Sequence, residues 1–340
     1  IRLNFEKGIK LVSNFNSDID LDEKVFYKYN KLLSKYNLED RIKLLAGNFS
    51  NNLSLNFDDT YKLQNYDYNL SGKLKKSNFL LAKSIKNDLI NDEIKELSFI
   101  ETQIKSNLSP TSFKISGIGK YSLDNSNFLD FKIDNNFSNN LLKINANFDF
   151  KNDLNLNLIN YKKSKEKIAN FAFEIEKKNN LINFKKLNYN EGDNSIKLLG
   201  LELKGNNLVS LKKINIETLN NNFSVKWNKK ISIKGTKFDA TYLPKFLSKQ
   251  NDKNIFNQVS KKFEIDIKNI KTPVSEKLKN FRLLGEIQKG KFIKLSSKSD
   301  FGEKNFLDIS MKTDKKSNKR FLEIYSDLPQ PLLSEYSFFK

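Results

Sequence analysis

The side chains that most often perform catalysis are missing from this sequence. Its 340 residues include no His and no Cys. Without His, the usual general base near neutral pH and the commonest transition-metal ligand are absent. Without Cys, there is no thiolate nucleophile, zinc knuckle, iron–sulfur cluster or disulfide. The chemistry that remains would use paired carboxylates, a Ser–Lys pair, or acidic oxygen ligands for Mg²⁺ or Ca²⁺.

The acidic runs and Ser–Lys pairs of the sequence do not supply a convincing metal or catalytic site either. The densest acidic run is Asp18, Asp20 and Asp22 with Glu23, which lacks the ligand spacing of a calcium loop and fits a helix start better. A Ser–Lys mechanism needs Ser-x-x-Lys on a buried helix, and Ser34-Lys35 does not supply it. We therefore predict that the chain is not an enzyme, with no catalytic residue, metal, cofactor or small-molecule substrate.

The chain is strongly basic. Lys and Arg number 60 against 40 Asp and Glu, so the net charge is +20. Asn, Lys and Ile are abundant together, as in AT-rich genomes, so much of this charge fits a solvated Lys-rich face. As a physical property it favours anionic surfaces such as phospholipid headgroups, lipopolysaccharide or nucleic acid. We expect no nucleic-acid partner, because Arg occurs only at positions 2, 41, 282 and 320 and base readout relies on Arg.

Most of the sequence alternates apolar and polar residues with period two, which is the pattern of strands with one apolar face. Turn signals such as 151–153 and 178–180 separate these runs at intervals of roughly 10–15 residues, too short for helical crossovers. The fold class predicted is mainly β, a long curved antiparallel sheet with one or two short helices. The clearest runs are Leu142, Ile144, Ala146, Phe148 and Phe150; Leu154, Leu156 and Leu158; and Phe171, Phe173 and Ile175.

Helical patterns are rare. Residues 22–36 carry apolar side chains at helical spacing, and Asp18, Asp20 and Asp22 would supply a cap and favourable charge at the start. A second helix is expected from 243 to 247 and beyond, with Pro244 at a tolerated early position. Residues 85–97 are compatible with either a helix or a loop.

Soft boundaries near 107–112 and 250–254 divide the chain into three expected regions. Residues 1–110 form a β-rich region with one helix, residues 111–250 an antiparallel meander, and residues 251–340 a further β region. The sequence begins with Ile1 and shows no signal peptide, so we expect a fragment of a longer protein.

A sheet with one apolar face must bury that face or present it to something apolar. Two arrangements stay open: a sandwich in which Phe and Leu are core, and a long curved sheet whose apolar side shelters lipid chains in an open or taco-like groove. The candidate groove residues are Leu142, Ile144, Phe148, Phe150, Leu154, Leu156, Leu158, Phe171, Phe173 and Ile175.

Three segments resemble a known family. In 234–247, a strand ends near Gly235, and Phe238 and Asp239 lead into an apolar turn at Leu243. The strand 321–325 leads into Ser326-Asp327 and an apolar turn, and 278–292 has a strand-turn-strand layout. These features resemble the AsmA-like proteins of the YhdP type over about 112–340, and more loosely over the first third. The family's amino-terminal anchor and a Gly-rich continuation after 332–333 are not matched.

The resemblance implies a periplasmic protein, anchored in the inner membrane by a segment outside this chain. Such a protein would hold phospholipid acyl chains in a β-groove and move phospholipid between the inner and outer membranes, supporting outer-membrane homeostasis. Each acyl CH₂ kept from water is worth about 0.8 kcal/mol, so a sheltered path removes a large barrier. The alternative is a purely structural or adhesive envelope protein of sandwich-like β structure.

Overall fold

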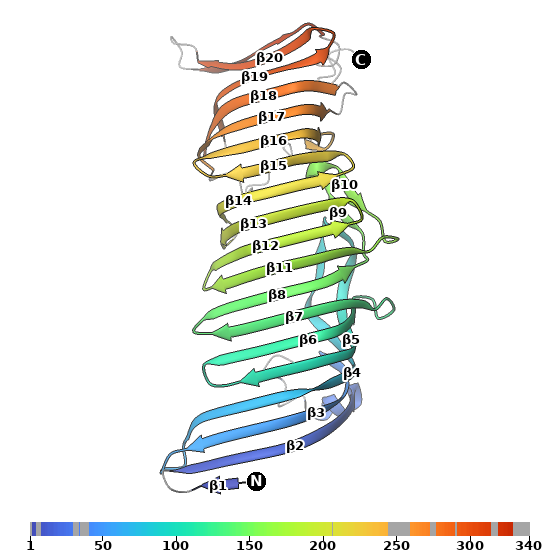
Figure 1. Cartoon of the computed structure of the whole chain (residues 1–340), viewed down its shortest axis with the longest axis vertical. Helices are drawn as coiled ribbons and strands as arrows, with labels where there is room; N and C mark the ends of the chain where they lie inside the picture. Colours follow the sequence, from blue (N-terminus) through green and yellow to red (C-terminus); the bar gives the residue numbers. More distant parts are fainter. Residues whose placement is uncertain are drawn as a thin grey trace. The chain divides into compact units, whose positions relative to one another are not determined.

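The computed structural model describes residues 2–4, 8–29, 34, 41–205, 207–243, 259–272, 277–289, 291–313 and 319–328. It is mainly β, as predicted, with very little helix among these residues (Figure 1). Its contacts divide the chain into two compact units. The first combines Ile1–Asn152 with Ile168–Asn179, and the second combines Asp153–Lys167 with Asn180–Lys340.

The first unit is built on one antiparallel sheet in which strands follow the chain order. Each strand pairs with the next, and β8 pairs with β11. The connections are tight: between β7 and β8, Asn139 and Asn140 both take positive φ angles, 50° and 60°, as a two-residue hairpin requires. The strands are β1 (Arg2–Asn4), β2 (Ile9–Asp22), β3 (Ile42–Phe57), β4 (Leu63–Asn87), β5 (Ile90–Leu108), β6 (Ser112–Ser122), β7 (Leu129–Ser138), β8 (Leu141–Phe150) and β11 (Ala169–Lys178).

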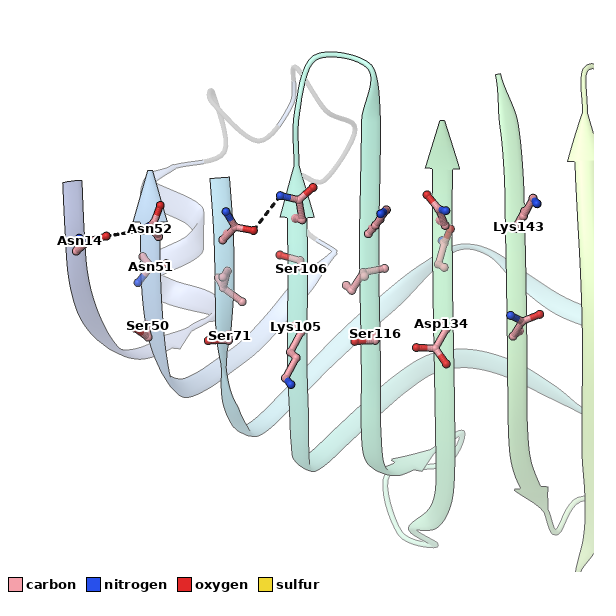
Figure 2. A pocket seen from close by; sticks show the side chains of 18 residues that line it. Asn14, Ser50, Asn51, Asn52, Ser71, Lys105, Ser106, Ser116, Asp134 and Lys143 are labelled. Carbon is pink, nitrogen blue, oxygen red and sulfur yellow. Dashed lines mark hydrogen bonds between the residues drawn. The ribbon is translucent and has the colours of Figure 1, made fainter. Parts of the chain in front are cut away.

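Long strands bend within this unit. Register shifts interrupt the β3–β4 and β4–β5 pairs, and Glu101 in β5 has a φ of 49°. Bulges of this kind bend a strand and increase its twist. Figure 2 shows the strands that carry Ser50, Ser71 and Lys105 bending sharply below these residues. Residues 85–97, expected as helix or loop, instead form the ends of β4 and β5, so that expectation was wrong.

The helix α1 (Glu23–Lys28) confirms the predicted start but is shorter than expected. Asp22 is its N-cap, and the carboxylate accepts a hydrogen bond from the Val25 backbone N–H at 3.0 Å. The cap assignment fails for Asp18 and Asp20, because β2 continues through both residues to Asp22. Residues 30–33 and 35–36 lie outside the described residues.

The second unit also contains a large sheet. Its strands pair antiparallel with their neighbours in chain order, except that β16 and β17 are parallel. The strands are β12 (Leu181–Glu191), β13 (Asn194–Lys204), β14 (Asn207–Thr218), β15 (Asn221–Trp227), β16 (Lys230–Asp239), β17 (Lys261–Lys271), β18 (Lys277–Gln288), β19 (Lys291–Gly302), β20 (Asn305–Thr313) and β21 (Arg320–Ser326). The excursion 153–167 adds β9 (Leu154–Leu156), a 3-10 turn η2 (Asn157–Ile159) and β10 (Tyr161–Lys163).

Two apolar clusters form the core of the second unit. One surrounds Leu211, Trp227 and Phe263, and the other surrounds Ile267 and Leu307. Of the expected helix at 243–247, the structure describes only Leu243. The expected boundary at 107–112 falls on the β5–β6 turn inside the first unit, and 250–254 lies outside the described residues.

Candidate functional site

A row of aromatic rings crosses the first unit from β4 to β11. Ring centroids of contacting neighbours lie 5.1–6.2 Å apart, and the Phe148 and Phe171 rings are stacked with an interplanar angle of 15°. We call this set the aromatic row: Phe79, Phe99, Tyr121, Phe131, Phe148, Phe150, Phe171 and Phe173.

Strand register explains why these rings meet. Phe148 lies opposite Phe131 on one side and opposite Phe171 on the other. Because successive side chains point to opposite faces, residues two apart on β8 and β11 share this face. The register therefore brings seven of the predicted groove residues together on one face: Leu142, Ile144, Phe148, Phe150, Phe171, Phe173 and Ile175.

Two glycines on β6 keep the row continuous. Phe99 and Phe131 belong to β5 and β7, with β6 between them, yet their ring centroids are 5.1 Å apart. A Cβ at Gly119 would lie 2.5 Å from the Thr102 hydroxyl oxygen, and a Cβ at Gly117 would lie 3.5 Å from the Phe131 ring. Sequence reasoning missed the β4–β7 members of the row, although Gly-x-Gly in an alternating strand was an available signal of close packing.

The rings differ in exposure along the strands. Tyr121 and Phe150 are buried, at 8% and 6% exposure, and the Tyr121 hydroxyl donates to the Asp149 carbonyl at 2.5 Å. Burial raises the pKa of Tyr121 above its ordinary value. Phe148 is only half-buried, as are Phe171 and Phe173. The row thus has buried rings where β6 and β8 end, and accessible apolar surface at Phe148, Phe171 and Phe173.

Three predicted groove residues are not part of this face. Leu154 is buried in β9, Leu156 is half-buried at the end of that strand, and Leu158 is exposed in η2. All three belong to the second unit. The expected strand 154–158 therefore ends at Leu156, because the chain turns through Asn160, which has a left-handed φ of 47°, into β10.

Asp239, one of the residues that carry the family resemblance, is a buried structural acceptor. It is 1% exposed and accepts hydrogen bonds from the Thr241 hydroxyl at 2.5 Å and the Asn160 amide at 2.9 Å. Lys271 lies 3.5 Å away as an ion pair. Burial favours a raised pKa for Asp239, but these partners outweigh it and hold the pKa below its ordinary value. The carboxylate joins η2 to β16.

The other resembling residues also serve packing. Gly235 allows close strand approach, because a Cβ there would lie 2.3 Å from the Asn222 carbonyl. Phe238 packs edge-on against Phe223 at 5.2 Å, and the Leu243 N–H donates to Ala240 at 3.0 Å.

The Ser326-Asp327 step ends β21. The Asp327 carboxylate accepts from the Phe306 backbone N–H at 2.7 Å, and the Ser326 hydroxyl donates to the Leu328 carbonyl at 2.8 Å. The bond to Phe306 holds the end of β21 against β20, and the bond to Leu328 closes the turn that follows β21.

The opposite face of the first unit is polar. An open pocket of about 680 Å³ on this face is lined mainly by Asn, Ser, Lys and Asp side chains of neighbouring strands. Figure 2 shows these side chains on the strands that carry them. The Asn52 amide donates to Asn14 at 2.6 Å, and the Asn107 amide donates to Asn69 at 2.8 Å. No aromatic side chain lines this pocket. Of the two faces, the one with the aromatic row is therefore the better match for an apolar ligand.

No helix in the described part of the chain is long and apolar enough to span a membrane. The same residues contain no group of three or more acidic side chains placed to hold a metal ion. Comparison of the chain with protein-family models, curated protein sequences and solved structures found no significant match.

Proposed function

We propose that the face of the first unit that carries the aromatic row binds the acyl chains of phospholipids. On this proposal the chain is a non-catalytic segment of an envelope protein that carries phospholipid between the inner and outer membranes. The observation that supports this proposal is the unbroken contact of eight rings, of which Phe148, Phe171 and Phe173 are only partly buried. The aromatic surface that is still exposed can be buried when an apolar ligand covers it.

The length of the row suits a lipid. It crosses six neighbouring strands, and strands lie about 4.8 Å apart, so the row spans roughly 24 Å. One leaflet accounts for half of the roughly 30 Å hydrocarbon core of a bilayer. An acyl chain of about 15 Å is therefore shorter than the row and could contact aromatic rings along all of its own length.

The bend of β4 and β5 supports a groove rather than a flat platform. Their hairpin returns toward the end of β8, where the Asn152 amide donates to the Asp92 carboxylate at 3.3 Å. Ile94, on the returning arm, is only 5% exposed. An arm that folds back in this way would form one wall, and the aromatic row the other. The periplasmic location and the inner-membrane anchor outside this chain are parts of the same proposal.

The decisive experiment is native mass spectrometry of the chain purified without detergent, followed by lipid extraction. We expect phospholipid to copurify with the native chain and to be lost in Phe148→Asp, because a carboxylate would be desolvated by the bound chain. The matched control is Ile118→Asp, which makes the same charge change in the same unit. Ile118 is 55% exposed and lies in register with Lys132 and Gln103 on the polar face.

A second variant separates a loss of lipid binding from a loss of folding. Ala146→Trp fills space beside Phe173, its partner in register, without adding charge, and is expected to reduce lipid occupancy with its β-sheet circular dichroism retained. Lipid retained equally by Phe148→Asp and Ile118→Asp, or absent from the native chain, would contradict the proposal. The apolar face would then be ordinary core, as in a structural or adhesive protein.

A further inference from the structure

A basic depression lies on the polar face of the second unit. It is open, has a volume of about 640 Å³, and is formed by the end of β15, the following turn and β16. The turn is tight, with the Asn228 N–H donating to the Lys230 carbonyl at 3.1 Å. The lining residues are Ser224, Lys226, Asn228, Lys229, Lys230, Ser232 and Lys234.

Like charges face each other at this depression. Lys226 lies directly opposite Lys213 of β14, and Lys230 is in register with Lys262 of β17. Like charges directly opposite in a sheet destabilise it. Glu264 offsets part of the charge, since its carboxylate pairs with Lys230 and with Lys234, the latter at 3.1 Å.

Three ammonium groups remain uncompensated. Among the described residues, no acidic side chain pairs with Lys213, Lys226 or Lys229. Farther along the same sheet, Arg282 pairs with Asp266 at 3.9 Å, so the positive charge is compensated at that position.

We infer that this depression binds a phosphate group of an anionic ligand, a phosphate monoester or a pyrophosphate. Lys ammonium groups bind phosphate as point charges. Lys226 and Lys229 line the depression, and Lys213 lies opposite Lys226 on the neighbouring strand β14. The Ser224 and Ser232 hydroxyls supply neutral donors at the same place. A bound phosphate would relieve the repulsion between Lys213 and Lys226. This inference does not depend on acyl-chain binding in the first unit.

The test is isothermal titration of the whole chain with inorganic pyrophosphate at moderate salt. We expect binding that weakens about tenfold or more in the double variant K213Q/K226Q, because two charge-assisted contacts are lost. The control is K73Q/K132Q, which removes two exposed lysines from separate strands of the first unit and lowers the net charge equally. It should leave the affinity within about twofold.

A second arm identifies the source of the phosphate. Monomeric dihexanoyl phosphatidate and glycerol 3-phosphate are titrated in parallel. Tighter binding of the phosphatidate, lost in K213Q/K226Q, would assign a lipid headgroup, and equal binding would assign a soluble phosphate ester. No binding of pyrophosphate, or equal weakening in both double variants, would overturn the inference, because only diffuse charge would then be at work.

Discussion

At the scale of single residues, the absence of a side chain at Gly119 shapes the proposed lipid-binding face. A Cβ there would meet the Thr102 hydroxyl oxygen at 2.5 Å and the Thr102 Cα at 2.6 Å. The second of these is a backbone atom, so a rotamer change cannot relieve the contact. Moving β5 away from β6 would also separate Phe99 from Phe131, which meet across β6 at 5.1 Å.

Gly119→Ala is therefore expected to lower the free energy of unfolding by about 1–3 kcal/mol, the usual cost of forcing extra volume into a packed site. Urea denaturation followed by circular dichroism would measure the change. Gly192→Ala is a poor control because Gly192 has a positive φ, so the better comparison is Ser126→Ala in an exposed loop. A Gly119→Ala protein as stable as this control would show that the strands separate at no cost.

At the scale of elements, the β9–β10 excursion is fastened to β12 by a buried polar cluster. The Tyr161 hydroxyl donates to the Glu191 carboxylate at 2.6 Å and lies 2.6 Å from the Tyr189 hydroxyl. Asn194 donates to Glu191 at 2.7 Å, and Lys167 forms an ion pair with it at 3.0 Å. Burial raises the pKa of Tyr161 above its ordinary value and that of Tyr189 to about 12, so both tyrosines remain neutral donors at physiological pH.

Because of this cluster, the free energy of unfolding depends on pH in the acid range. Burial favours a raised pKa for Glu191, but hydrogen bonds from Tyr161, Lys167 and Asn194 outweigh it and lower the pKa below its ordinary value of 4.5. The stabilisation is therefore present above pH 4.5 and is lost as the pH falls through the lower folded-state pKa.

Glu191→Gln is expected to destabilise the chain by about 1–3 kcal/mol at pH 7, because a charged acceptor of three donors is removed. The difference from the native chain should shrink as the pH is lowered below about 4. Chemical denaturation at pH 7 and pH 3 would measure it, with Asp193→Asn, an exposed carboxyl in the adjacent turn, as the control. A difference that is constant with pH would contradict the role of the carboxylate.

At the scale of the whole molecule, the amino-acid composition limits how much the net charge changes with pH near neutrality. The chain has no His and no Cys, which are the side chains whose charge changes most readily between pH 6 and pH 8. Each of the eight carboxyls at Asp58, Glu93, Asp124, Glu191, Asp239, Glu264, Glu323 and Asp327 has a pKa held below its ordinary value, away from that range. The net charge of +20 is thus nearly constant across it.

We expect the free energy of unfolding to vary by less than about 0.5 kcal/mol between pH 6 and pH 8. Denaturation in matched buffers of constant ionic strength would test this, because surface charge effects depend on salt. A marked slope in this window would reveal a titrating group whose pKa is strongly perturbed.

The sequence by itself determined the fold class, which is mainly β, and which side chains lie on the same face of a strand. Alternation at Phe148 and Phe171 fixed which side chains share a face, because the period of a strand is two residues whatever its partners are. The same reasoning located the turns and the N-cap at Asp22. It failed at residues 85–97 and 154–158, where polarity and length do not distinguish a strand end, a loop and a short turn.

Only the tertiary structure decided which residues meet across strands. Phe99 and Phe131 lie 32 positions apart and touch because β6 presents glycines between them. The parallel pairing of β16 with β17 likewise depends on a long connection, whose course alternation does not encode. In the sequence Asp239 belongs to a local motif, but its hydrogen-bond partner Asn160 comes from the excursion between β8 and β11. Local patterns fix the direction of a side chain, whereas contacts between distant segments depend on register and strand order, which emerge only when the sheet is assembled.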